Sequence, residues 1–261
     1  MKESAGLWVR RFAGEPPPLV VLHGFTQTGE MYRELADLLG REVLGPDLPG
    51  HGRSVGVPAS FASAVKGVAE VLAAAGGPVP LVGYSQGGRV ALAVALERPE
   101  LLSHLVLVSA SAGIEDESVR AERRRSDLAL VDELKARGLG VFLDRWLARP
   151  MFEGLERRGA TWRATDRAAR LENTAEGLAA ALVGMGQGTQ PFFGDRLGDL
   201  LMPVLVIAGS LDKKYASIAT AMSRSLPHGT LRMIPDAGHA VVGEQPRGVA
   251  DLVAGFLTGA G

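Results

Sequence analysis

The pentapeptide Gly83-Tyr84-Ser85-Gln86-Gly87 constrains the fold of this chain more than any other segment. The apolar residues 79–82 before it predict a strand, and residues 88–97, rich in Val, Ala and Leu, predict a helix. A serine on such a strand-to-helix turn is forced outward on a strained backbone, and glycines flank it because a side chain would clash. The helix N-terminus would offer N–H groups and positive dipole to a developing oxyanion. The pattern predicts a nucleophile elbow, and the alternative is a plain glycine-rich turn.

Composition excludes several classes of function. The 261 residues suffice for one large α/β domain, or for a core domain with an insertion. A net charge of −1 argues against nucleic acid or an anionic membrane as a partner. The chain has no cysteine, so disulfides, thiolate catalysis and cysteine-bound metals are excluded.

The sequence contains no sign of membrane targeting. Residues 1–4 lack the charged region and apolar stretch that open a signal peptide. No uninterrupted apolar run reaches the ~18 residues that a transmembrane helix needs. We therefore expect a cytoplasmic protein. For its oligomeric state we expect a monomer or a small homo-oligomer.

Apolar strands alternate with helices along most of the chain, which predicts a mostly parallel, doubly wound α/β sheet with both faces covered. Residues 111–190 interrupt this rhythm, because they contain no strand-like run and suggest several helices broken near 138–140, 149–150 and 159. The predicted organisation is a core over residues 1–110, an inserted helical cap over 111–190, and the rest of the core over 191–261. The expected strands are 7–11, 18–22, 43–44, 79–82, 105–108, 203–209 and 230–234, and the expected core helices are 30–39, 61–75, 88–97, 216–226 and 247–257.

A serine hydroxyl needs a histidine to take its proton. Of the five histidines, His239 is the best candidate, because it lies in a loop that leaves the carboxyl end of a predicted strand. His23 also follows a strand but stands beside a glycine, so we interpret it as structural or as part of an oxyanion loop. His51 lies in a glycine-rich loop, while His104 and His228 are typical of surface or turn positions.

The carboxylate that orients this histidine should also follow a strand. Asp212 does so, in Ala208-Gly209-Ser210-Leu211-Asp212. Asp236 would have to fold back on its own turn, and Asp47 belongs to an earlier strand. We therefore predict Ser85, Asp212 and His239 as the catalytic residues.

The predicted oxyanion hole consists of two backbone N–H groups. One belongs to Gln86, which follows the serine, and the other to Phe25 in the loop His23-Gly24-Phe25.

Together these motifs resemble the α/β-hydrolase superfamily, whose catalytic residues follow the same chain order. The resemblance covers nearly the whole chain and implies the α/β-hydrolase fold. It does not fix the reaction, since the superfamily contains esterases, C–C hydrolases, peroxidases, lyases and receptors. The motifs are His23-Gly24-Phe25, residues 47–54 (DLPGHGRS), the pentapeptide around Ser85, and Gly238-His239.

Arg89 lies four residues after Ser85, about one turn along a similar helix face. A cation in the first turn opposes the helix dipole by about 0.3–1 kcal/mol. An anion in the cleft would offset this cost. The alternative is a solvated arginine that covers the helix edge.

The cap is not a basic lobe, since residues 111–190 contain 13 acidic residues and 13 lysines or arginines. Its densest charged run, residues 120–127, includes Arg123 and Asp127 at i,i+4 spacing. On composition alone this run indicates a charged helix face with internal ion pairs.

The cap nevertheless resembles the 2-succinyl-6-hydroxy-2,4-cyclohexadiene-1-carboxylate synthase family, which are lyases of menaquinone biosynthesis. The resemblance implies that Arg89, Arg123 and Arg170 hold substrate carboxylates, while Tyr84 and Trp146 line the pocket. Arg124 and Arg125 directly follow Arg123, so the sequence leaves open which of the three arginines faces the pocket. The residues that carry the resemblance are Glu122, Arg123, Asp127, Phe142, Arg145, Trp146, Pro150, Met151, Phe152, Arg170, Asn173, Gly177, Leu178, Ala179 and residues 184–191 (GMGQGTQP).

The family's reaction removes a ring proton and expels pyruvate from a substrate with three carboxylates. Guanidinium groups suit carboxylates in bidentate geometry. The resemblance implies that Ser85 acts as a base with His239, and that no metal or organic cofactor is needed. Two alternatives stay open: a serine hydrolase of esters or C–C bonds that forms an acyl intermediate, and a non-catalytic binding protein.

Overall fold

The computed structural model describes residues 6–259. Residues 1–4, on which the expectation about a signal peptide rests, lie outside the described residues. No helix within residues 6–259 is long and apolar enough to cross a membrane.

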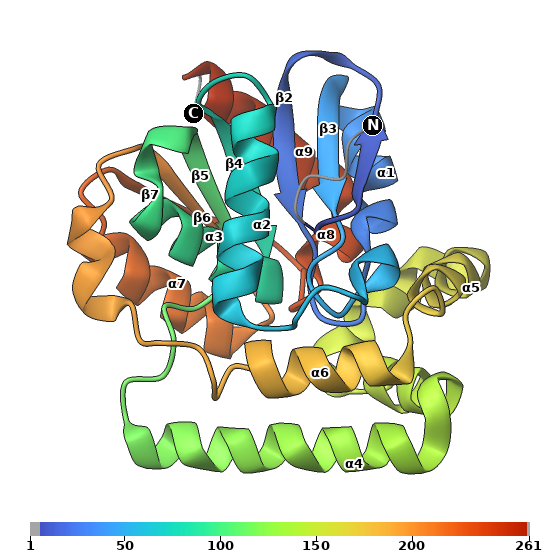
Figure 1. Cartoon of the computed structure of the whole chain (residues 1–261). Helices are drawn as coiled ribbons and strands as arrows, with labels where there is room; N and C mark the ends of the chain where they lie inside the picture. Colours follow the sequence, from blue (N-terminus) through green and yellow to red (C-terminus); the bar gives the residue numbers. More distant parts are fainter. Residues whose placement is uncertain (1–5, 260–261) are drawn as a thin grey trace.

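Seven strands form one sheet in the order β1-β3-β2-β4-β5-β6-β7 (Figure 1). Only β1 runs antiparallel, against β3, and all other neighbouring strands are parallel. The predicted mostly parallel sheet is therefore confirmed. The strands are β1 (Val9–Phe12), β2 (Glu15–Leu22), β3 (Arg41–Pro46), β4 (Val79–Tyr84), β5 (Leu102–Val108), β6 (Val204–Gly209) and β7 (Gly229–Ile234).

The central strands are buried on both faces. Every residue of β4 and of β6 is buried, as expected for continuous apolar strands covered by helices. One face packs on α2 (Phe61–Ala74), α3 (Gln86–Glu97) and α7 (Lys213–Ser225), and the other packs on α1 (Arg33–Leu39) and α9 (Pro246–Thr258). Because the parallel strands run in the same direction, their carboxyl ends meet at one edge of the sheet, where α4 (Glu117–Leu147) and α6 (Ala175–Met185) lie (Figure 1).

A layer of helices lies over this edge. α4 (Glu117–Leu147) bends at Gly138, whose φ of 76° interrupts the helical backbone. It is followed by the 3-10 segment η4 (Pro150–Arg158), α5 (Gly159–Arg170) and α6 (Ala175–Met185). The breaks at Gly138, Pro150 and Gly159 fall where the glycines and the proline predicted them.

These helices share a small hydrophobic core of their own. It includes Leu134, Phe142 and Trp146 from α4, Phe152 from η4, and Leu178 from α6. This core holds the helices over the sheet edge, so side chains of the cap and of the sheet loops face the same space.

A few boundaries differ from expectation. The first strand begins at Val9, two residues later than predicted, and α7 begins at Lys213, three residues earlier, because Asp212 caps it by accepting from the Tyr215 N–H. The short helix α8 (Val241–Glu244) was not predicted. The remaining short 3-10 segments are η1 (Gly29–Tyr32), η2 (Gly52–Ser54), η3 (Pro99–Leu101) and η5 (Gly194–Asp199).

Candidate active site

Ser85 occupies a strained turn between β4 and α3. Its φ of 51° and ψ of −109° lie outside the regions that L residues normally adopt. The backbone around it is crowded: a Cβ on Gly83 would lie 2.5 Å from the Gly87 carbonyl oxygen, and a Cβ on Gly87 would lie 2.2 Å from that of Leu22. Only glycine fits at these two positions, which is the geometry of a nucleophile elbow.

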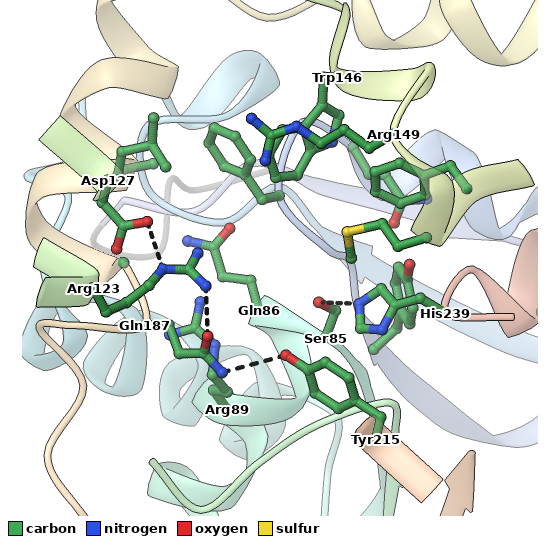
Figure 2. Close-up of a pocket in the computed structure, with 18 of the residues that line it drawn as sticks. Ser85, Gln86, Arg89, Arg123, Asp127, Trp146, Arg149, Gln187, Tyr215 and His239 are labelled. Carbon is green, nitrogen blue, oxygen red and sulfur yellow. Dashed lines mark hydrogen bonds and ion pairs between the residues drawn. The ribbon is translucent and has the colours of Figure 1, made fainter. Parts of the chain in front are cut away.

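The structure brings the three predicted catalytic side chains together. The Ser85 hydroxyl oxygen lies 3.1 Å from His239 Nε2 (Figure 2), and His239 Nδ1 lies 2.8 Å from Asp212 Oδ2. With Nδ1 donating to Asp212, Nε2 is free to accept the serine proton. This chain of hydrogen bonds can move a proton from Ser85 to the imidazole.

Asp212 is held in its charged form. Partial burial works against ionisation, but the hydrogen bonds from His239 and from the Tyr215 N–H outweigh it and keep the Asp212 pKa below its ordinary value. A carboxylate at this position stabilises an imidazolium on His239 during proton transfer.

The two competing aspartates have other contacts. The buried carboxylate of Asp47 accepts from the N–H groups of Gly29 and Arg53, so it organises its own loop. Asp236 is exposed and has a φ of 55°, and its carbonyl accepts from Arg157. Neither hydrogen-bonds to His239.

The other histidines do not take part in this network. His23 is fully buried, with Nδ1 donating to the Gly24 carbonyl and Nε2 accepting from the Leu48 N–H. Burial lowers the pKa of His23 to about 4 and that of His51 to about 3, so both stay neutral at pH 7. His104 is partly buried and His228 is exposed.

The predicted oxyanion donors lie at the same pocket. Gln86 is the first residue of α3, where helix geometry leaves its N–H without an intrahelical acceptor. Within residues 6–259 the Phe25 N–H also has no protein acceptor. Both residues line the pocket that contains Ser85.

Arg89 is buried, with 8% of its surface exposed, so the alternative of a solvated arginine is wrong. One guanidinium nitrogen donates to the Met185 carbonyl at 3.0 Å and, more weakly, to Gln190 Oε1 at 3.5 Å. No carboxylate in residues 6–259 lies within ion-pair distance of it. Burial accordingly lowers the pKa of Arg89 to about 10, and the group remains a cation at pH 7.

Of the three adjacent arginines of α4, Arg123 faces the pocket. It donates to Asp127 at 2.9 Å and to Gln187 Oε1 at 2.7 Å (Figure 2). Arg124 instead binds the Gly188 carbonyl and Glu117, and Arg125 is exposed. The ion pair with Asp127 that composition indicated is therefore present, at the wall of the pocket.

Arg170 also lines the pocket, but its guanidinium is occupied. Two of its nitrogens form a fork on Asp166, at 2.7 and 3.2 Å, and the third donates to the Thr26 hydroxyl. Asn173 donates to the Thr26 carbonyl as well, at 2.8 Å. These contacts tie the cap to the residue next to Phe25 and so fix the predicted oxyanion loop.

Several pocket residues were not found from the sequence. The Tyr215 ring packs against the His239 ring at a tilt of 55°, with 4.4 Å between the ring centres, and its hydroxyl accepts from the Gln187 amide. Arg149 lies over the Trp146 ring, 4.5 Å from its centroid. Their proximity in the sequence to predicted site residues could have indicated them. Tyr215 stands three residues after Asp212, and Arg149 stands three residues after Trp146. The full lining is Phe25, Gln27, Tyr84, Ser85, Gln86, Arg89, Arg123, Asp127, Trp146, Arg149, Met151, Phe152, Arg170, Ala181, Leu182, Gly186, Gln187, Tyr215 and His239.

Glu244 was also missed, because it acts behind His239. Its buried carboxylate accepts from the N–H groups of Gly238 and Ala240, at 2.8 and 3.1 Å, and thus brackets the histidine. Arg157 of η4 pairs with it at 3.1 Å. The cap therefore contacts the loop that presents His239. No cluster of three or more potential metal-ligating side chains occurs among residues 6–259.

Comparison with known proteins agrees with this geometry. Residues 19–252 match the model of the alpha/beta hydrolase family. This chain belongs to the alpha/beta hydrolase family.

Two relatives within the family share a name. A Bacillus subtilis protein, provisionally named 2-succinyl-6-hydroxy-2,4-cyclohexadiene-1-carboxylate synthase, is 35% identical over 92% of this chain and 90% of its own length. A Salmonella heidelberg protein with that name is 32% identical over 96% of this chain and 98% of its own.

Two solved structures extend the comparison. MenH from S. aureus superimposes with a TM-score of 0.91 at 28% identity, over 98% of this chain and 99% of its own. A thermophilic esterase from Thermogutta terrifontis, solved with malate bound, gives a TM-score of 0.84 at 28% identity, over 97% of this chain and 93% of its own.

Proposed function

We propose that this chain is a lyase that eliminates pyruvate from 2-succinyl-5-enolpyruvyl-6-hydroxy-3-cyclohexene-1-carboxylate to give 2-succinyl-6-hydroxy-2,4-cyclohexadiene-1-carboxylate. The observation that carries the proposal is Arg89, a buried guanidinium one helical turn from Ser85 that has no acidic partner in the described part of the chain. The names of the two relatives support it. The proposal keeps the cytoplasmic, cofactor-free reaction that the sequence led us to expect.

The two compound names define the bonds that change. A proton leaves C2, and its electrons form the C2=C3 double bond. The former C3=C4 pair becomes C4=C5, and the C5–O bond to the enolpyruvyl group breaks. The released enolpyruvate takes up one proton to become pyruvate.

C2 carries the succinyl ketone, so loss of its proton places negative charge on the ketone oxygen as an enolate. The N–H groups of Phe25 and Gln86 would stabilise that oxygen, as they would stabilise a tetrahedral oxyanion in a hydrolase. This is why an oxyanion hole can serve an elimination.

Ser85 is proposed as the base. Its hydroxyl passes a proton to His239 Nε2, at 3.1 Å, while its oxygen takes the proton from C2. Asp212 stabilises the imidazolium that results, and no acyl-enzyme forms. The proton on His239 is then available for the leaving enolpyruvate.

The cationic residues bind the substrate. Arg89 and Arg123 are proposed to hold carboxylates, and Trp146 and Tyr84 to line the space for the ring. Arg170 lines the same space, and its contacts with Asp166 and Thr26 make support of the oxyanion loop its larger role.

The second candidate is a serine esterase, which the similarity to the Thermogutta terrifontis esterase favours. The decisive experiment supplies the enolpyruvyl substrate, follows pyruvate with a coupled dehydrogenase, and measures p-nitrophenyl ester hydrolysis in parallel. We expect pyruvate release well above background, lost in Ser85→Ala, with no acyl-enzyme detected by mass spectrometry. Background-level pyruvate release together with rapid acylation by the ester would refute the lyase and support the esterase.

A further inference from the structure

The guanidinium groups around the pocket differ in how much of their charge is already balanced. Arg123 is paired with Asp127, and all three nitrogens of Arg170 are used by Asp166 and Thr26. Arg89 has no acidic partner among residues 6–259. Of the three arginines that the family resemblance implied, Arg89 is therefore the one whose charge is balanced by no carboxylate among the described residues, although one of its nitrogens donates to the Met185 carbonyl.

Arg149 is a second such cation. It follows α4 directly, and its backbone is fixed because its N–H donates to the Trp146 carbonyl and its carbonyl accepts from the Phe152 N–H. Its guanidinium lies 4.5 Å from the centre of the Trp146 ring. In the part of the chain that the structure describes, no carboxylate lies within 4.0 Å of it.

The surroundings of Arg149 favour an anion. Partial burial lowers the pKa of Arg149 below its ordinary value. The nearby carboxylate of Glu133 raises this pKa, whereas the cations Arg123 and Arg145 lower it further. Glu133 is already paired with Arg145. A carboxylate in the pocket would relieve this local excess of positive charge.

Arg149 and Arg89 belong to different walls. Arg89 comes from α3 of the sheet core, whereas Arg149 comes from the cap, and Figure 2 shows Arg149 at the top of the pocket and Arg89 at the bottom, with Ser85 to the right of Arg89. An arginine stacked on an indole keeps its N–H edge free for a bidentate contact. The sheet core and the cap thus each present a separate position for a carboxylate in the pocket that contains Ser85.

We propose that Arg149 is a substrate-binding residue that holds a carboxylate on the cap side of the pocket, opposite the one held by Arg89. The inference rests on the proposed function, whose substrate carries three carboxylates on separate arms. It makes the cap a determinant of specificity, because an ester with a single charge could engage only one wall.

The test compares Arg149→Gln with Arg145→Gln, using pyruvate release by the intact protein. The control removes the same charge from the same end of α4, but Arg145 is exposed, paired with Glu133, and absent from the pocket lining. We expect Arg149→Gln to raise KM about 10-fold to 100-fold, with kcat changed less than about 2-fold. Arg145→Gln should leave both within about 2-fold, and Arg149→Lys should restore part of the affinity.

A purely structural Arg149, covering Trp146, predicts a different result. Arg149→Gln would then lower the thermal midpoint and kcat together, with little change in KM. That result, or equal KM values for Arg149→Gln and Arg145→Gln, would overturn the inference.

A binding measurement separates this inference from the proposed function. Calorimetric titration with tricarballylate, a small tricarboxylate, needs no turnover. Weaker binding to Arg149→Gln than to wild type supports the inference even if no pyruvate is released, and equal binding to both proteins refutes it.

Discussion

Replacement of Arg89 by methionine should stabilise the free protein while it abolishes activity. Burial lowers the pKa of Arg89 to about 10, well below its ordinary value in water. At about 1.4 kcal/mol per pH unit, the folded chain holds this cation at a cost of about 3 kcal/mol. Methionine removes that cost but leaves the Met185 carbonyl without its donor, which costs about 1–2 kcal/mol. The net gain is about 1–2 kcal/mol, or a rise of about 3–6 °C in Tm for a chain of this size.

The assay pairs thermal unfolding with kinetics at pH 7. In the absence of ligand, Arg89→Met should melt above wild type. Tricarballylate should raise the Tm of wild type clearly more than that of Arg89→Met at the same concentration, because a ligand stabilises a protein in proportion to how tightly it binds. Pyruvate release should fall about 100-fold or more in kcat/KM, since a buried charge-assisted contact with the substrate is lost.

A lower Tm for Arg89→Met would refute this reasoning. It would mean that the hydrogen bonds of Arg89 to Met185 and Gln190 stabilise the fold by more than burial of the cation destabilises it. Arg89→Lys distinguishes charge from geometry: it should keep the low Tm of wild type but bind the tricarboxylate more weakly, because an ammonium cannot form a bidentate fork.

Two further predictions concern the loops around the site. Glu244→Gln should reduce kcat about 10-fold with little change in KM, because it weakens the charged hydrogen bonds that bracket His239, whereas Glu34→Gln at an exposed ion pair should change neither. His23 and His51 have folded pKa values of about 4 and about 3, against about 6.5 when unfolded, so between pH 7 and pH 5 the unfolded chain takes up protons that the folded chain does not. The free energy of unfolding should therefore fall by about 2 kcal/mol for each of these histidines over that range, and urea denaturation at the two pH values measures it; a flat profile would contradict their burial as neutral groups.

Much of the fold could be predicted because its strands are short, apolar and separated by helical periodicity. Buried parallel strands need no alternation, so β4, β5 and β6 stand out as continuous apolar runs. The cap breaks were equally visible at Gly138, Pro150 and Gly159. The four-residue helix α8 could not be predicted, since one helical turn has no period to detect.

The pairing of charges at the site was harder to predict than which residues belong to the site. Arg123 with Asp127 and Asp166 with Arg170 both have i,i+4 spacing, which indicates an ion pair in either case. Sequence alone could not tell that the second pair is fully buried and bound to Thr26, while the first lies at the pocket wall. That difference depends on how α5 packs on the core, and so on tertiary structure.

The distribution of unbalanced charge is what separates the two candidate reactions. The hydrogen-bonded chain of Ser85, His239 and Asp212 would serve an esterase equally well, so it does not distinguish a base from a nucleophile. A neutral ester does not compensate the cost of about 3 kcal/mol for keeping Arg89 as a buried cation that no carboxylate of residues 6–259 pairs with. A substrate with three carboxylates does, because its binding supplies the missing partners on both walls of the pocket. The proposal of a lyase therefore depends less on the catalytic hydrogen bonds than on two guanidinium groups, Arg89 and Arg149, that no carboxylate of the described chain pairs with.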